Sequence, residues 1–267
     1  MPGDERCHPL LGGCPPSWAT SWGQQDGLGV FVGFSVEGAE QRMRWIPPGR
    51  FMMGSPDAEG FADEQPRHEV TITRGFWLGE TPVTQAMWTA VMGHNPSRFT
   101  TDTDLPMENV SWSECMSFCE QLNKRIEGLR VGLPTEAQWE YACRAGAGQM
   151  RYPGSLDDIA WYLDNSGGKT HPVGEKQPNA FGLYDMLGNV WEWCRDGWWS
   201  YDAVPQQDPV GPERAGVLRV YRGGSWAHEA GVVRAASRYP DDPGIRHQYL
   251  GLRLARGQEQ PAEGSAG

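Results

Sequence analysis

The sequence has no long hydrophobic run and no excess of basic residues, and each absence excludes a class of function. No stretch approaches the roughly 20 apolar residues that a membrane-spanning helix needs. Lys and Arg number 23 against 34 Asp and Glu, which gives a net charge of −11. A phosphate-binding protein needs clustered basic side chains, and no such cluster occurs. We therefore expect neither nucleic acid nor an anionic membrane surface as a partner.

Cysteine is also scarce, with 6 in 267 residues and no spacing typical of a disulfide framework. The first residues, Met1 to Arg6, lack the basic and apolar regions of a secretory signal. We therefore expect reduced, buried thiols in a cytoplasmic, monomeric protein. Cys115 and Cys119 have metal-binding side chains, but no second Cys or His pair lies near them in the sequence, which argues against zinc.

Glycine, proline and tryptophan are abundant, at 35, 21 and 13 residues. Gly and Pro interrupt helices and strands, so the composition indicates many turns, and the tryptophans indicate a core of large rings. We expect one domain over residues 22–256, with a poorly ordered N-terminal extension at 1–21 and a disordered tail at 257–267.

Local patterns predict three helices, over residues 84–92, 111–126 and 135–145. The second and third begin with Ser-x-x-Glu and Thr-x-x-Gln, the pattern of a capping box. No helix is expected after Gly146. Residues 30–36 and 68–73 have strand patterns, and residues 57–64 form an acidic loop that we expect to be exposed.

Five ordered motifs resemble those of the sulfatase-modifying-factor family, whose founding member is the formylglycine-generating enzyme. They span residues 45 to 255: Pro48-Gly49-x-Phe51-x-Met53-Gly54-Ser55, Leu133 to Ala142, Gly182 to Trp193, Arg222-Gly223-Gly224-Ser225-Trp226 and Gly251-Leu252-Arg253-Leu254-Ala255. The last departs from the family pattern, because Leu252 stands where the family usually has Phe. The resemblance implies an irregular, loop-rich α+β fold related to C-type lectin domains.

The resemblance leaves the activity open. Formylglycine-generating enzymes bind copper through two cysteines that follow the Gly-Gly-Ser motif, and Cu(I) needs such thiolates. Here no cysteine follows Cys194, so we expect neither that copper site nor its oxidation of a substrate cysteine, and no haem. Iron-dependent sulfoxide synthases have a similar domain, but their ligands lie on an additional helical domain. An oxygen- or metal-dependent enzyme of either type remains the alternative function.

A third branch of the resemblance is formed by the variable proteins of diversity-generating retroelements, which bind ligands between the Arg-Gly-Gly-Ser-Trp and Gly-Phe-Arg-Leu-Ala motifs. We therefore predict a non-catalytic protein that binds a protein or other macromolecule through residues 227–249; an ordinary solvated surface is the alternative. Adenine mutagenesis reaches most residue types found there, but not Glu229 or Gln248. Four arginines, at 222, 234, 238 and 253, are expected to form scaffold ion pairs. The candidate ligand-binding residues are Trp226, Ala227, His228, Glu229, Gly231, Val232, Ser237, Tyr239, Asp241, Asp242, Ile245, His247 and Tyr249.

The resemblance also implies a structural calcium site at the Gly-Asn-Val-Trp-Glu turn. Its ligands map onto the side chains of Asp185 and Glu192 and the carbonyls of Gly188 and Val190. Hard oxygen ligands with two carboxylates suit Ca²⁺. The alternative is that Glu192 pairs with a nearby arginine.

Overall fold

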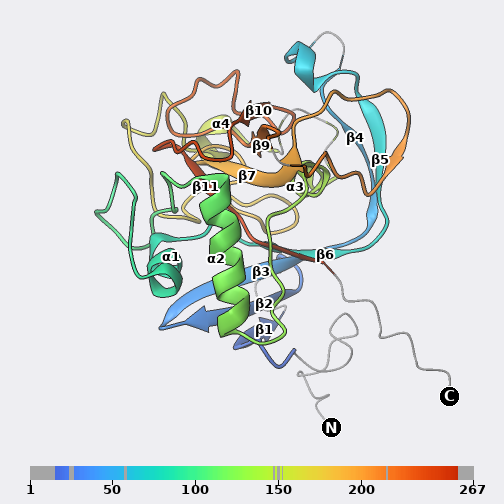
Figure 1. Cartoon of the computed structure of the whole chain (residues 1–267). Helices are drawn as coiled ribbons and strands as arrows, with labels where there is room; N and C mark the ends of the chain where they lie inside the picture. Colours follow the sequence, from blue (N-terminus) through green and yellow to red (C-terminus); the bar gives the residue numbers. More distant parts are fainter. Residues whose placement is uncertain are drawn as a thin grey trace, which may run out of the picture.

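The computed structural model describes residues 16–23, 27–56, 59–146, 148, 151, 153–214 and 216–257. Three sheets and a few helices are joined by long loops (Figure 1), so the predicted α+β, loop-rich class is confirmed. Most of the expected extension and tail, residues 1–15 and 258–267, lies outside the described residues. None of the described helices has the length and apolar character needed to cross a bilayer.

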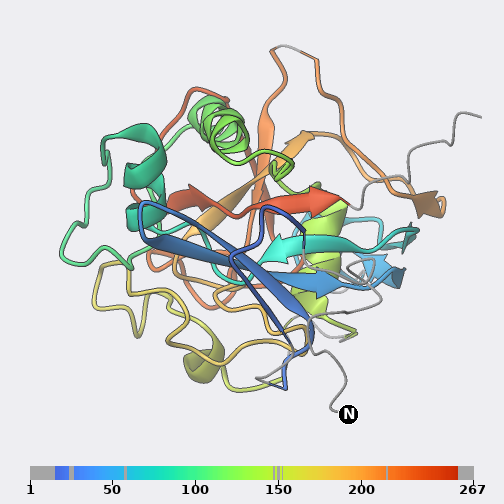
Figure 2. The same cartoon turned by 90° about the horizontal axis from the view of Figure 1, so that it is seen from below.

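A five-stranded antiparallel sheet forms the lower end of the molecule in Figure 1, and Figure 2 shows its strands from below. Trp18 is only 6% exposed and packs edge-on against Phe34 of this sheet, with ring centroids 6.4 Å apart. The domain therefore includes residues that were expected to belong to the extension. The strands, in sheet order, are β1 (Ser21–Gly23), β2 (Phe31–Val36), β3 (Ala39–Ile46), β6 (Phe76–Gly79) and β12 (Ala255–Gly257).

The three predicted helices are confirmed as α1 (Gln85–Met92), α2 (Trp112–Arg125) and α3 (Glu136–Arg144). Both predicted capping boxes form, because each cap side chain and its partner three residues later exchange hydrogen bonds with backbone N–H groups. The structure adds one short helix, α4 (Leu156–Ile159), in a region where no helix was expected. Its single turn is too short to leave a periodic pattern in the sequence.

A four-stranded sheet supports the segment that was predicted to bind ligands. Its order is β10 (Arg238–Asp241), β9 (Arg219–Arg222), β7 (Trp191–Gly197) and β11 (Leu250–Leu252), with β11 parallel to β7. Gly251 of β11 passes the backbone of Met107 so closely that a Cβ atom would lie 2.0 Å from the Met107 carbonyl oxygen. This approach explains why the last motif begins with glycine.

A third, smaller sheet lies to one side in Figure 1 and contains β4 (Gly49–Met53), β5 (His68–Ile72) and β8 (Gln206–Gln207). Between β4 and β5, a 3-10 turn (Ala62–Glu64) buries Glu64 completely. The expectation that this whole acidic loop is exposed was therefore wrong for Glu64. Its carboxylate is paired with Arg234, 2.6 Å away, which makes its burial tolerable.

Large rings fill the core, as the composition predicted. Trp88 stacks on Phe118 with centroids 4.9 Å apart, which joins α1 to α2. Trp139, Trp191 and Trp193 are each at most 1% exposed. Rings of this size contribute much of the buried apolar area, which is the main favourable term in folding.

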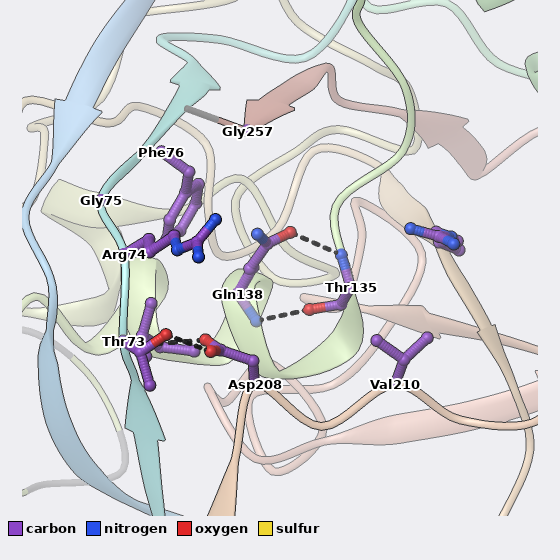
Figure 3. Close-up of a pocket in the computed structure, with 11 residues that line it drawn as sticks. Thr73, Arg74, Gly75, Phe76, Thr135, Gln138, Asp208, Val210 and Gly257 are labelled. Carbon is purple, nitrogen blue, oxygen red and sulfur yellow. Dashed lines mark hydrogen bonds between the residues drawn. The ribbon is translucent and has the colours of Figure 1, made fainter. Parts of the chain in front are cut away.

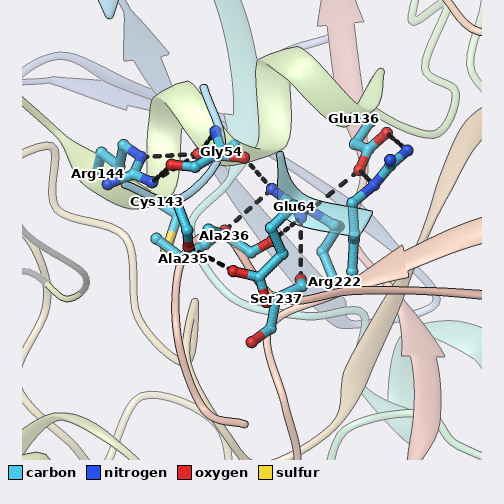
Figure 4. Close-up of polar contacts among 12 residues, drawn as sticks. Gly54, Glu64, Glu136, Cys143, Arg144, Arg222, Ala235, Ala236 and Ser237 are labelled. Carbon is cyan, nitrogen blue, oxygen red and sulfur yellow. Dashed lines mark hydrogen bonds and ion pairs between the residues drawn. The ribbon is translucent and has the colours of Figure 1, made fainter. Parts of the chain in front are cut away.

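A buried network of arginines and glutamates connects α3 to the segment between β9 and β10 (Figure 4). Arg222 is fully buried, pairs with Glu140, and donates to the carbonyls of Ala236 (2.6 Å) and Ser237 (3.0 Å). Arg238 donates to both oxygens of Glu136, at 2.7 and 2.8 Å. These contacts confirm that the arginines serve the scaffold, and they fix the backbone that enters β10.

Candidate ligand-binding face

The segment 226–249 leaves the four-stranded sheet after β9 and returns to it at β11. Gly224 enables the exit, because its φ is +78° and a Cβ atom there would lie 2.8 Å from the Val233 side chain. Midway, β10 pairs with β9 in an antiparallel register that places Tyr239 opposite Tyr221. The segment is therefore held at both ends and in the middle.

A cluster of aromatic rings forms the centre of this segment. Trp191 lies beneath it at 1% exposure, with its ring centroid 5.3 Å from Tyr239 and 5.5 Å from His228. Tyr249 packs against the edge of His228 at 5.1 Å and stacks on His247 at 4.8 Å. Except for Trp191, these rings are half-buried, so each packs on the core and also presents an edge or a face to solvent.

Hydrogen bonds fix the polar atoms of the two histidines. The Trp191 indole N–H donates to Nδ1 of His228 across 3.3 Å, and the Ser225 hydroxyl lies 2.7 Å from the same nitrogen. Because Nδ1 accepts a hydrogen bond, the neutral ring has its hydrogen on Nε2. Burial, together with the nearby His247, lowers the pKa of His228. His247 in turn contacts Asp241, with Nε2 and Oδ2 3.1 Å apart.

The structure brings most of the predicted ligand-binding residues to one surface. Glu229, Gly231, Asp242 and Ile245 are exposed, and Ala227, Val232 and Asp241 are half-buried, like the ring cluster. Two residues do not fit this description. Ser237 is fully buried beside Arg222 and does not reach the surface, and Trp226, at 8% exposure, lies at its edge. We call the exposed and half-buried residues between 227 and 249 the C-terminal face.

Residues from an earlier part of the chain complete this face, and no sequence pattern predicted them. Phe99 packs edge-on against Trp226 at 5.4 Å, and the Asn109 N–H donates to the His247 carbonyl at 2.9 Å. Beside them is an open hollow of about 350 Å³. It is lined by Arg98, Asn109, Arg246, His247, Gln248 and Tyr249. A contact between positions more than a hundred residues apart leaves no local pattern in a single sequence.

A second hollow of about 350 Å³ lies between β5, β6 and the start of α3 (Figure 3). Its polar groups largely satisfy one another. The Thr73 N–H donates to Asp208 at 2.9 Å, and Thr135 and Gln138 form the capping box of α3. Arg74 also lines this hollow. None of these residues belongs to the C-terminal face.

The residues predicted to bind calcium do not fit an ion in their present arrangement. Both oxygens of Glu192 accept hydrogen bonds from Arg253, at 2.7 to 3.1 Å, and the Trp139 indole N–H also donates to one of them at 2.6 Å. The Asp185 carboxylate accepts from the Gly174 N–H at 2.7 Å. An ion at Glu192 would lie beside the guanidinium of Arg253, whose charge repels it. Calcium therefore stays a prediction that requires Arg253 to move.

The cysteines of the described residues do not offer a copper site either. Cys115 and Cys119 lie on α2, Cys143 on α3 and Cys194 on β7, and all four are buried. Burial raises the pKa of each thiol, so the thiolate that copper needs is disfavoured. Within the described residues, no group of three or more His, Cys, Asp or Glu side chains is arranged to hold a metal ion.

The fold and its long loops define a domain of the formylglycine-generating-enzyme type, related to C-type lectin domains. The chain belongs to the sulfatase-modifying factor family, since the profile of the Sulfatase-modifying factor enzyme 1-like domain matches residues 33–258.

Three relatives illustrate the range of this family. Formylglycine-generating enzyme of Streptomyces coelicolor is 31% identical over an alignment of 285 positions, gaps included, which covers 79% of this chain and 87% of that enzyme. Serine/threonine-protein kinase pkn1 of Chlamydia caviae is 31% identical over 80% of this chain, which spans only 38% of the relative's length. Treponema denticola variable protein 1 has a similar structure, with 32% identity, a TM-score of 0.76, and coverage of 85% of this chain and 98% of that one.

Proposed function

We propose that this domain is a non-catalytic binding protein whose C-terminal face contacts a protein or other macromolecular ligand. The observation that supports this most is the half-buried ring cluster of His228, Tyr239, His247 and Tyr249. His228 and Tyr239 pack on Trp191, Tyr249 packs on His228, and His247 stacks on Tyr249. Rings fixed in this way offer a large contact area and lose little conformational entropy on binding. The buried ion pairs beneath them keep the backbone in place.

Similarity to Treponema denticola variable protein 1 supports the further proposal that a retroelement diversifies the face. The proposal extends to exposed positions such as Asp242 and Ile245, and it excludes Ser237, which is buried. Sequencing around the gene tests it. We expect a reverse transcriptase and a nearby repeat that matches residues 219–256 and differs mainly at adenines. Their absence would refute diversification but leave binding intact.

The alternative is an oxygen- or metal-dependent enzyme, and the observation that favours it is the sequence similarity to formylglycine-generating enzymes. An assay with copper, oxygen and a cysteine-containing peptide tests it directly. We expect no aldehyde product, because the segment after Gly224 contains no cysteine. Stoichiometric copper together with aldehyde formation would establish the enzyme and overturn the binding proposal.

Site-specific photo-crosslinking tests binding through the face. We would place a benzophenone amino acid at Ile245, which is 38% exposed on the face, and at Val204, which is 60% exposed and lies outside it. In extracts of the organism that encodes the chain, we expect one discrete adduct from position 245 and none of that mass from position 204. Equal labelling from both positions would show that the face is not where a partner binds.

A further inference from the structure

The hollow beside Tyr249 is bounded by two parts of the chain with different origins. Arg246, His247, Gln248 and Tyr249 come from the C-terminal face, whereas Arg98 and Asn109 come from the segment that follows α1. A hydrogen bond joins the two sides, because the Asn109 N–H donates to the His247 carbonyl at 2.9 Å. On its own side, the Asn109 side-chain amide donates to the Pro96 carbonyl at 2.8 Å. The two sides are therefore held at a fixed separation.

The carboxylate of Glu108 binds the backbone at Arg98 and Phe99 and holds it in place. One carboxylate oxygen, Oε1, accepts hydrogen bonds from the N–H groups of Arg98 and Phe99, the second at 3.0 Å. Glu108 is fully buried, whereas Arg98 is exposed at the rim of the hollow. The loop is thus fixed, while the guanidinium remains accessible to a ligand.

The charges around the hollow are unevenly compensated. Arg246 is neutralised by Glu114, which accepts two hydrogen bonds from its guanidinium at 2.7 Å each. His247 is in contact with Asp241. Arg98, in contrast, forms no ion pair with any carboxylate in the described part of the chain. The guanidinium of Arg98 lies 5.9 Å from the centre of the Phe99 ring. The hollow therefore combines a guanidinium that has no ion-pair partner in the described residues with the amide of Gln248 and the hydroxyl of Tyr249, all groups that donate hydrogen bonds.

We propose that Arg98 makes this hollow a subsite for a carboxylate, so that the C-terminal face selects protein partners presenting an acidic side chain. This inference rests on the proposed function and adds a ligand class to it. A planar guanidinium binds a carboxylate through two parallel hydrogen bonds, which gives specificity as well as affinity. Arg98 lies outside residues 227–249, so it would be a constant anchor beside residues that are free to vary.

Titration of the full-length protein with short peptides, followed by NMR of arginine side-chain and backbone N–H signals, tests the subsite. The probes are acetyl-Gly-Asp-Gly-amide and its isosteric Asn counterpart. We expect the Asp peptide to cause saturable shifts at Arg98, Gln248 and Tyr249, and the Asn peptide to cause none. Equal responses to both peptides would overturn the proposal, because they would show that the charge is not recognised.

Two variants make the test specific. Arg98→Gln removes the charge and should weaken binding of the Asp peptide about tenfold or more. Arg74→Gln is the matched control: Arg74 is also exposed, pairs with no carboxylate in the described residues and lines the other hollow, so the affinity should not change. An equal loss in both variants, or none in Arg98→Gln, would overturn the proposal. If position 245 gives a discrete crosslink but binding of the Asp peptide does not depend on Arg98, the subsite is rejected and the proposed function is retained.

Discussion

The indole N–H of Trp191 donates to Nδ1 of His228 across 3.3 Å, and this bond joins the core to the C-terminal face. A protonated imidazole would have hydrogens on both nitrogens, and the one on Nδ1 would point at the indole N–H. Burial already lowers the pKa of His228, and the indole opposes protonation further. The geometry therefore favours the neutral form of His228, with its hydrogen on Nε2.

Replacing Trp191 with Phe should raise the pKa of His228, because the opposing donor is lost. The pKa is measured from the imidazole signals in NMR titrations of the wild type and the variant. In the wild type, the lowered pKa means that the contribution of His228 to the free energy of unfolding is fully present above about pH 6.5. This contribution declines as the pH falls through the folded-state pKa. An unchanged or lower pKa in Trp191→Phe would contradict the role of this hydrogen bond.

The carboxyl group of Glu108 should make stability depend on pH in the opposite direction. Burial raises its pKa to about 7, and its Oε2 atom is buried without a hydrogen-bond partner in the described residues. Its contribution is fully present below the unfolded pKa of about 4.5 and is lost as the pH rises through about 7; between pH 5 and 8 the loss is about 2–3 kcal/mol. Urea unfolding from pH 5 to 8 should show this decline relative to Glu108→Gln.

Glu120→Gln on the exposed side of α2 is the control for Glu108, because its carboxyl group is solvated. We expect the difference in unfolding free energy between this control and the wild type to stay constant from pH 5 to 8. If Glu108→Gln behaves in the same way, burial does not perturb Glu108 as inferred.

Two arginine ion pairs should differ sharply in their effect on stability. Arg222→Met removes the buried partner of Glu140 and the donor to three backbone carbonyls, and should cost about 3–5 kcal/mol. Arg246→Met breaks an ion pair that is 55% exposed on the arginine side, and should change the unfolding free energy far less, because solvent screens an exposed pair. Urea unfolding at pH 7 measures both. Similar losses would mean that burial does not determine the strength of these pairs.

Local features of this fold could be predicted from sequence, because each is encoded in a few adjacent residues. Ser111 with Glu114 and Thr135 with Gln138 specify the starts of α2 and α3 through side chains three positions apart. The surface seen by a ligand could not be predicted in the same way. Phe99 meets Trp226, and Asn109 meets His247, only after the chain has folded back across the sheet. Ser237 was misplaced for a related reason, since its burial follows from the position of Arg222.

Glu192 and Arg253 allow a last prediction, on calcium. Arg253 is fully buried and donates to both oxygens of Glu192, and its remaining N–H groups donate to the carbonyls of Gly79 and Tyr184, both at 2.7 Å. A calcium ion at Glu192 would have to displace this buried guanidinium, and breaking a buried pair costs about 3–5 kcal/mol. We therefore expect the same melting temperature with excess calcium and with excess chelator.

The control for this measurement is Arg253→Met, which removes the cation and leaves the carboxylates of Asp185 and Glu192 in place. This variant should melt at a lower temperature than the wild type, and calcium should partly restore it, because an ion that binds only the folded state stabilises it by mass action. Stabilisation of the wild type by calcium, lost in Glu192→Gln, would show instead that the ion displaces the arginine. The predicted calcium site would then be real, and the Glu192–Arg253 pair would describe only the calcium-free protein.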